Sequence, residues 1–136
     1  MEYHLSKKTL LDQLGQWNRF IKRKVHLIAC GGTALTLLDV KPSTKDIDFM
    51  VPIESEHRSL LKVLNEYDLI ASKLFRGTGV DFEDCLMLVR VRKEKVDINR
   101  LEQHVKELAG YDTSEERIIK NLVIFLDLLR EEKLYG

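Results

Sequence analysis

Apolar side chains recur at the spacing of an amphipathic helix in the first segment of the chain, at Leu10, Leu14, Trp17 and Ile21. Charged and amide residues separate them, and Ser6 precedes them as a plausible cap. The short apolar run 25–30 then ends in two glycines, and the apolar segment 33–38 suits a helix that begins right after them. The pattern predicts a helix, a strand, a glycine turn and a second helix.

Residues 46–51 alternate polar and apolar side chains and stop at Pro52, so they predict a second strand. Further along, we expect a helix at 55–67 capped by Ser55, a strand at 69–75, a turn at 76–79, and a hairpin of strands at 85–91 and 95–99. Residues 101–136 are expected to form C-terminal helices, the last of which opens with a capping box at 113–116. The chain shows no repeat or low-complexity stretch, which favours one domain over 1–136.

Composition and charge narrow the classes of protein that this pattern fits. The 136 residues are 44% hydrophobic and 32% charged, which is ordinary for a globular protein. The 22 Lys and Arg residues balance 22 Asp and Glu residues, so no overall positive field exists to hold a long nucleic acid. No apolar run approaches the roughly 20 residues of a membrane span, and residues 1–9 are too polar for a signal peptide. We therefore expect a cytoplasmic protein.

The cysteines and histidines carry no recognisable chemistry. Cys30 and Cys85 lie in apolar runs without a CxxC spacing, so we interpret both as reduced core residues. The four histidines have no ligand spacing, and the chain contains no Walker lysine loop, HExxH helix or serine-hydrolase motif.

The clearest chemical signal lies in the predicted strand 46–51. Residues two apart in a strand project from the same face, so Asp46 and Asp48 are expected side by side while Ile47 and Phe49 enter the core. Two carboxylates at this spacing repel each other unless a cation lies between them. Mg²⁺ is the natural cation, because it binds through one or two carboxylates together with substrate phosphates.

Asp97 is the candidate for a third carboxylate. Val96 and Ile98 flank it, so in a strand it would also turn away from the core. The competing acids within 81–84 are expected in a charged loop flanked by glycine, where solvated acids need no explanation. Three carboxylates on one sheet face could hold two metal ions roughly 3.5–4 Å apart.

Gly31 and Gly32 add a candidate phosphate site. Their missing side chains let the backbone approach a ligand, and the free N–H groups of the following helix would point at a phosphate. Thr33 adds a hydroxyl near the same place. Next to an acidic pair, this describes a site for a nucleoside triphosphate, where catalysis consists of positioning and charge neutralisation.

In this order, Gly31-Gly32, Asp46-Ile47-Asp48-Phe49 and Val96-Asp97-Ile98 resemble the nucleotidyltransferase superfamily of DNA polymerase beta. The likeness is to its small prokaryotic members, such as minimal nucleotidyltransferases and the antitoxin-type and abortive-infection enzymes, and it covers about residues 5–99. It implies an α+β nucleotidyltransferase fold, with a mixed β-sheet, helices packed on one face and an acidic metal cleft on the other.

The resemblance also implies roles for individual residues. Asp46, Asp48 and Asp97 would be the catalytic carboxylates that bind two Mg²⁺ ions, and Gly31, Gly32 and Thr33 would hold the triphosphate. Asp97 would also help to deprotonate the acceptor. The implied reaction moves a nucleoside monophosphate, with ATP as the expected donor, to a hydroxyl and releases pyrophosphate. The acceptor stays open between a protein side chain, a tRNA end and an aminoglycoside-like small molecule.

Two positions depart from the family pattern, which often reads G-G-x-A-L-x-L-x-G-x-x-R-x-T-x-D-I-D. Here the later Gly is replaced by Asp39, and the Arg is replaced by Pro42. Lys41 and Lys45 flank the second position and are the candidates to supply its charge, so Lys45 joins the nucleotide-binding set.

Other interpretations stay open. The small size and the wide apolar stripe of the last helix also fit a non-catalytic, antitoxin-like binding module that keeps a nucleotide or metal site. The resemblance makes a HEPN-type toxin a candidate partner in a toxin–antitoxin setting, and self-association through the C-terminal helix is the other use of the stripe. A metal-dependent nuclease is a third interpretation, which the glycine turn argues against. Arg90, Arg92 and Asn99 fit either substrate contacts or ordinary strand residues.

Overall fold

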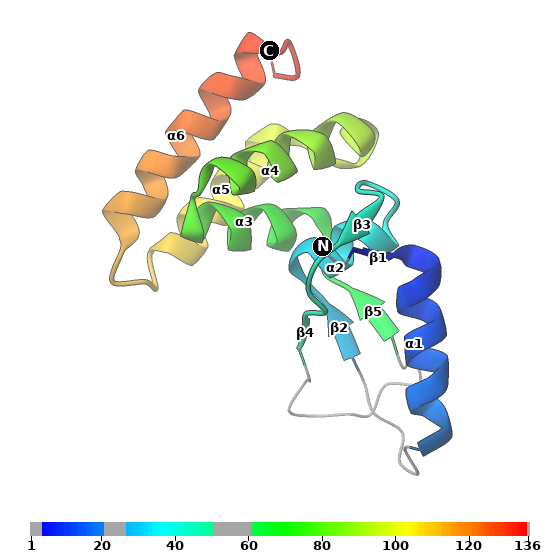
Figure 1. Cartoon of the computed structure of the whole chain (residues 1–136). Coiled ribbons are helices and arrows are strands. Elements are labelled where there is room, and N and C mark those ends of the chain that lie inside the picture. The colour runs from blue at the N-terminus through cyan, green and yellow to red at the C-terminus, as the bar shows by residue number, and fades with distance from the viewer. Residues whose placement is uncertain (1–3, 21–26, 51–60, 136) are drawn as a thin grey trace. The chain divides into compact units, whose positions relative to one another are not determined.

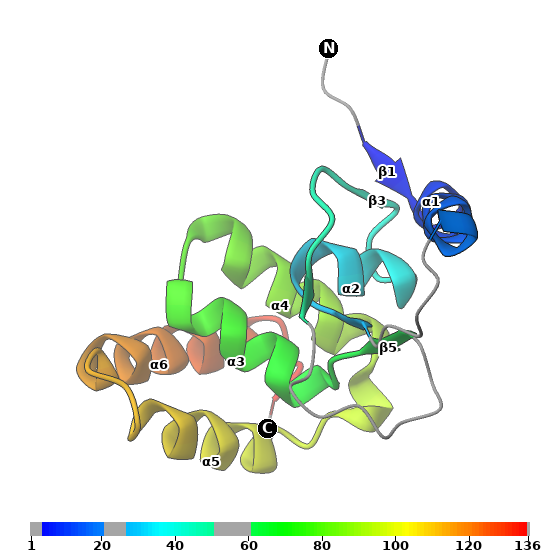
Figure 2. The ribbon, with the colours of Figure 1, turned by 90° about the horizontal axis from the view of Figure 1, so that it is seen from below.

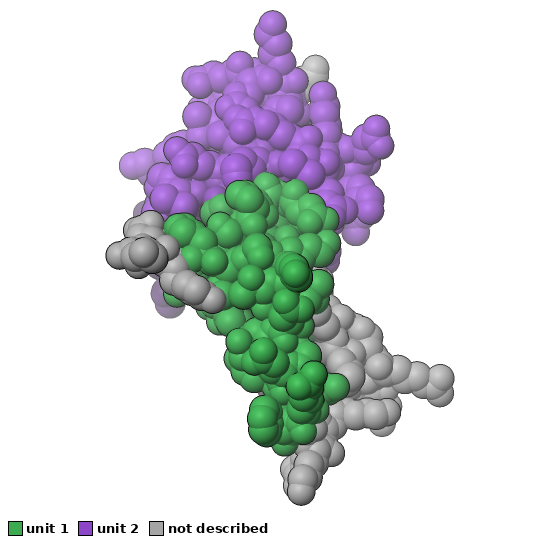
Figure 3. Space-filling view, turned by 45° about the vertical axis from the view of Figure 1, so that its right-hand side comes forward, with its two compact units in different colours: residues 1–64 green, residues 65–136 purple. Residues whose placement is uncertain are grey.

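The computed structural model describes residues 4–20, 27–50 and 61–135 and has an α+β fold (Figure 1). The chain divides into two compact units, residues 1–64 and residues 65–136 (Figure 3). All the assigned strands lie in the first unit, whereas the second unit is helical in its described part. That the whole chain is one nucleotidyltransferase domain stays a prediction.

The first unit holds two small sheets and two helices in its described part. The elements are β1 (Leu5–Ser6), α1 (Lys7–Phe20), β2 (Leu27–Ala29), α2 (Gly31–Leu37), β3 (Ser43–Thr44), β4 (Phe49–Met50) and β5 (Leu61–Val63). Strand β2 lies between β4, to which it is antiparallel, and β5, to which it is parallel (Figure 1). β1 and β3 form a separate antiparallel pair. The three-stranded sheet is therefore mixed.

The helix predicted at the start of the chain forms, although only Leu10 of its apolar face is buried, Leu14 is half-buried and Trp17 is exposed in the described residues. The Thr9 N–H donates to Ser6 Oγ at 3.2 Å, so Ser6 caps α1. The side chain of Leu10, in the first turn of α1, is fully buried. The predicted strand, glycine turn and helix are confirmed as β2 and α2, while residues 21–26 lie outside the described residues. Of the predicted strand 46–51, only residues 49–50 pair as β4 in the described residues.

The second unit consists of four helices and a short 3-10 turn in its described part. These are α3 (Glu66–Arg76), α4 (Gly79–Val91), η1 (Lys93–Lys95), α5 (Ile98–Ala109) and α6 (Glu115–Glu131). Helix α3 packs against α4, α5 and α6, which surround it in Figure 2. Fully buried Leu69, Leu74, Leu101 and Phe125 belong to the core of this unit. In the described residues, no helix combines the length and the apolar character that crossing a bilayer requires.

The predictions of three strands in this unit are wrong. Residues 69–75 lie in α3, residues 85–91 lie in α4, and residues 95–99 run from the 3-10 turn into α5, so the expected hairpin does not form. Short apolar runs do not distinguish a buried strand from a buried helix, and these helices are apolar on several sides. The caps decide the outcome, because Asn65, Thr78 and Asp97 each accept backbone N–H groups of the first helical turn.

The predicted helix 55–67 and the capping box at 113–116 are also corrected. Residues 61–63 form β5, and the helix begins only at Glu66, while residues 51–60 lie outside the described residues. At the start of α6 the cap residue is Ser114, whose side chain makes no capping hydrogen bond. The backbone N–H of Ser114 donates to Asp112 Oδ1 at 2.7 Å.

The acids within 81–84, expected in a solvated loop, include two buried charges of α4. Asp81 is completely buried and accepts hydrogen bonds from Arg76 at 2.6 and 2.8 Å and from the Thr78 hydroxyl at 2.7 Å. Burial alone would raise the pKa of Asp81, but hydrogen bonds from Arg76 and Thr78 and the charge of Arg76 lower it to about 2. Lys73 Nζ lies 2.9 Å from Asp84 Oδ2, with both side chains buried. These contacts join α3 to α4.

Both cysteines are reduced, as predicted, but only Cys85 is a buried core residue, because Cys30 is half-buried. Burial raises the pKa of the Cys85 thiol well above its usual range. Cys85 therefore stays protonated and acts as a core residue.

Asp39, the first departure from the family pattern, lies just after α2. Its φ is +61°, and the N–H of Val40 donates to the Leu35 carbonyl at 2.9 Å, as in a Schellman motif. This left-handed position favours Gly, and Asp is among the few other residues that tolerate it. The substitution therefore preserves the backbone that a glycine would form.

We expect the stability of Asp39 variants to follow this backbone. Asp39→Ala should unfold at least about 1 kcal/mol more easily than Asp39→Gly, because alanine pays the left-handed penalty. Asp39→Gly should stay near wild type, since it loses only an exposed ion pair with Lys7 at 2.9 Å. Urea unfolding measures both, and equal stability of the two variants would contradict this assignment.

Candidate nucleotide and metal site

The bend between β2 and α2 requires glycine for two separate reasons. Gly31 has a φ of +55°, and a Cβ added to it would lie 3.3 Å from Asp48 Oδ2. A Cβ added to Gly32 would lie only 2.6 Å from Thr44 Oγ1. The bend therefore lies against the carboxylate of Asp48 on one side and the hydroxyl of Thr44 on the other.

The hydroxyl of Thr33 joins this bend to the acidic segment. It donates to the Asp46 carbonyl at 3.0 Å and accepts the N–H of Asp48 at 2.8 Å. The Thr33 side chain is completely buried, and its two hydrogen bonds to the backbone of Asp46 and Asp48 are partly buried. Thr33 therefore acts as a positioning residue for the two acids, and its predicted contact with phosphate stays a prediction.

Thr44 supports the same segment and was not recognised as important from the sequence. Its hydroxyl donates to the Asp46 carbonyl at 3.1 Å, and the residue is buried. Cys30 N–H also donates to the Asp48 carbonyl at 3.2 Å. The signal was available, because Thr44 matches the T of T-x-D-I-D in the family pattern.

The charged side chains among residues 45–49 are exposed. Lys45, Asp46 and Asp48 are exposed, whereas Ile47 and Phe49 are half-buried. This is the alternation that the strand interpretation predicts, although residues 46–48 approach β4 without sheet pairing to it. Two exposed carboxylates and one ammonium group thus lie on the segment that Thr33 and Thr44 hold against the glycine bend.

Asp97 belongs to the second unit and has a local structural role. It is the N-cap of α5, where its Oδ1 accepts the N–H groups of Asn99 at 3.0 Å and Arg100 at 3.3 Å. Its buried neighbours Val96 and Leu101 occupy the two positions of a hydrophobic staple. An exposed acid between buried residues therefore fits a helix cap as well as a strand, and the strand prediction is wrong here.

The structure brings five of the predicted site residues together within the first unit: Gly31, Gly32, Thr33, Asp46 and Asp48. Lys45 directly precedes Asp46 in the acidic segment. Asp97 as a third metal ligand stays a prediction.

Replacing Asp97 by Asn removes its negative charge but keeps a side-chain oxygen that can cap α5, whereas replacing it by Ala removes both. Asp97→Ala should cost about 1 kcal/mol of unfolding free energy, whereas Asp97→Asn should cost much less, because Asn caps helices as well as Asp. Urea unfolding monitored by circular dichroism measures both. Equal losses in the two variants would contradict the capping assignment.

The other candidate substrate contacts have partners in the second unit. Arg90 forms an ion pair with Glu132, and Arg92 lies 4.0 Å from Glu66. Asn99 Oδ1 accepts the Tyr135 hydroxyl at 3.2 Å. These contacts hold the helices of that unit together, and none of the three residues lies in a strand as predicted.

The described ranges 4–20, 27–50 and 61–135 contain no group of three or more His, Cys, Asp and Glu side chains arranged to hold a metal ion. Within the first unit, the candidate site brings the carboxylate of Asp48 against the glycine bend, with the exposed acid Asp46 in the same segment. Comparison of the chain with protein-family models, with curated proteins and with solved structures found no match.

Proposed function

We propose that the chain is a magnesium-dependent nucleotidyltransferase that moves a nucleoside monophosphate from ATP to a hydroxyl of an acceptor and releases pyrophosphate. The observation that carries the proposal is the contact between the acidic segment and the glycine bend. An added Cβ on Gly31 would lie 3.3 Å from Asp48 Oδ2, so a ligand held at the backbone of the bend would also reach this carboxylate.

The donor set of the first unit fits magnesium. Asp46 and Asp48 offer exposed carboxylate oxygens, and Mg²⁺ usually binds through one or two carboxylates plus the phosphates of its substrate. A bound Mg²⁺ would neutralise charge on the phosphates during transfer. That Asp97 supplies a third carboxylate for a second ion, as the family resemblance implies, stays a prediction.

The remaining residues of the site would bind and position. The backbone at Gly31 and Gly32 would lie close to the triphosphate, because no side chain keeps the ligand away. Thr33 and Thr44 would hold the acidic segment in place through their hydrogen bonds to the Asp46 carbonyl. Lys45 would supply positive charge near Pro42, the position at which relatives of the family often carry Arg.

A non-catalytic nucleotide-binding module is the second candidate function. The observation that favours it is the capping role of Asp97, which accounts for this acid without any catalysis. In a toxin–antitoxin setting such a module would act on a HEPN-type partner by contact.

A transfer assay tests the proposal. The full chain is incubated with ATP labelled at the α-phosphate, Mg²⁺ and candidate acceptors, including the products of neighbouring genes, and labelled acceptor is measured. We expect transfer that Asp46→Asn and Asp48→Asn abolish and that Asp12→Asn, a substitution of an exposed acid on α1, leaves unchanged. Transfer that persists in both site variants would overturn the metal assignment. Magnesium-dependent nucleotide binding without transfer to any acceptor would favour the non-catalytic module.

A further inference from the structure

The face of α6 that points away from the core of the second unit carries an ordered arrangement of apolar and charged side chains. Its exposed members include Arg117, Lys120, Val123, Ile124, Asp127 and Glu131. The opposite face buries Ile118, Leu122 and Phe125 in the core. The exposed face is therefore not needed to fold the helix onto its own unit.

Two large apolar side chains lie at the centre of this face. Val123 is 52% exposed and Ile124 is 40% exposed, although they lie between the buried Leu122 and Phe125. An aliphatic side chain left in water forgoes the free energy that burial would give, about 25 cal/mol for each Å² covered. The centre of the face is therefore the natural place for a contact.

The charges around this centre change sign along the helix. Arg117 and Lys120 precede it, whereas Asp127 and Glu131 follow it. In two parallel copies of α6, Lys120 would face Lys120 and the like charges would repel. In two antiparallel copies, the basic half of one helix would face the acidic half of the other. With a two-fold axis midway between Val123 and Ile124, Lys120 comes level with Asp127 of the other copy.

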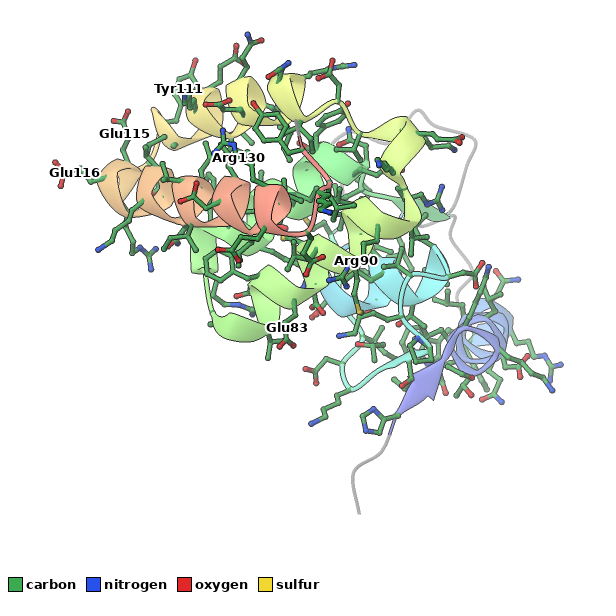
Figure 4. The ribbon with its side chains drawn as sticks, turned by 90° about the horizontal axis from the view of Figure 1, so that it is seen from above. Glu83, Arg90, Tyr111, Glu115, Glu116 and Arg130 are labelled. Atoms are coloured by element: carbon green, nitrogen blue, oxygen red, sulfur yellow. The ribbon has the colours of Figure 1, made fainter. Side chains whose placement is uncertain are left out.

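The arginines farther from the centre have partners within their own copy. Arg117 donates to the Phe75 carbonyl at 3.0 Å, and Arg130 forms an ion pair with Asp127 at 3.1 Å and lies over the ring of Tyr135. Figure 4 shows Glu116 near the N-terminal end of α6 and Arg130 toward its C-terminal end. The axis therefore pairs Lys120 with Asp127 twice, and this repeated pair of opposite charges makes the centre of the face self-complementary.

We propose that the outer face of α6 is a docking surface for a second copy of this chain, bound antiparallel about an axis between Val123 and Ile124. The apolar pair supplies the contact at the centre. The ion pairs around it, exposed and individually weak, select the antiparallel orientation. The proposal does not depend on the proposed function.

Charge reversal in the full chain tests this interface by sedimentation equilibrium. Wild type should show a monomer–dimer equilibrium, and Lys120→Asp or Asp127→Lys should each weaken dimerisation about tenfold, because both place like charges opposite each other twice. An equimolar mixture of the two variants should regain wild-type affinity, since each then meets only opposite charge. Val123→Asp should also weaken dimerisation, and Glu83→Lys, an exposed reversal on α4 (Figure 4), should not.

Circular dichroism serves as the folding control, and each variant should keep the helical content of the wild type. A wild-type chain that stays monomeric at all accessible concentrations would overturn the proposal. A dimer that both single reversals leave unchanged, or a mixture no tighter than the separate variants, would place the interface elsewhere and overturn it as well.

Discussion

Lys73→Met should destabilise the second unit by about 3–5 kcal/mol, the usual cost of removing one partner of a buried ion pair. Lys73 Nζ lies 2.9 Å from Asp84 Oδ2 and 4.0 Å from Asp81 Oδ1, and these side chains are at most 7% exposed. Methionine fills nearly the same space but removes the ammonium group that faces both carboxylates. Urea unfolding followed by circular dichroism at 222 nm, the usual helical band, measures the loss.

The double variant Lys73→Met/Asp84→Leu provides the control for this prediction. It should cost much less than the two single substitutions together, because well-packed apolar residues can replace a buried pair at little cost. Lys93→Met, on an exposed lysine of the 3-10 turn, should change stability by less than about 0.5 kcal/mol. A loss in Lys73→Met no larger than in Lys93→Met would contradict the structural role of the pair.

Gly32→Ala should impair both the stability and the nucleotide binding of the first unit. The added Cβ would lie 2.6 Å from Thr44 Oγ1, which is buried and bonded to the Asp46 carbonyl. Either the helix or Thr44 must move, at a cost of about 1–3 kcal/mol, and movement of Thr44 shifts the acidic segment. Thermal unfolding and nucleotide titration measure the two effects.

Gly15→Ala is the matched control, because a Cβ at Gly15 meets nothing within 4 Å. Gly15 lies inside α1, so this variant should gain about 0.5–1 kcal/mol and bind nucleotide as wild type does. The pair Gly32→Ala/Thr44→Ala removes the closest contact and should recover part of the lost stability. Wild-type binding by Gly32→Ala alone would show that the bend does not position the site.

In the first unit, the sequence predicted the secondary structure correctly where local signals and packing agree. Ser6 caps α1, and the apolar run before Gly31 forms β2, because the glycines interrupt the pattern where the chain turns. The acids of residues 46–48 are exposed as their alternation predicts. What the sequence pattern lacked were the hydrogen bonds of Thr33 and Thr44, which depend on the position of α2 against the acidic segment.

The second unit was predicted less well, for a physical reason. Helices α3 and α4 bury nearly continuous runs at 69–71, 73–74, 84–86 and 88–89, and such runs resemble buried strands. Thr78 and Asp97 were the deciding residues, but a cap is visible in a sequence only when a helix is already expected after it. Asp81 and Asp84 showed no sign of burial, because their partners Arg76 and Lys73 lie on another helix.

The most direct test of the proposed site is calorimetric titration of the full chain with a non-hydrolysable ATP analogue, with and without Mg²⁺. We expect binding that requires Mg²⁺ and that Asp46→Asn and Asp48→Asn each weaken about tenfold or more, a loss of about 1.4 kcal/mol. Asp12→Asn should bind as wild type does. Binding of equal strength without Mg²⁺, or binding that both site variants retain, would contradict a nucleotide–metal site at the Gly31 bend.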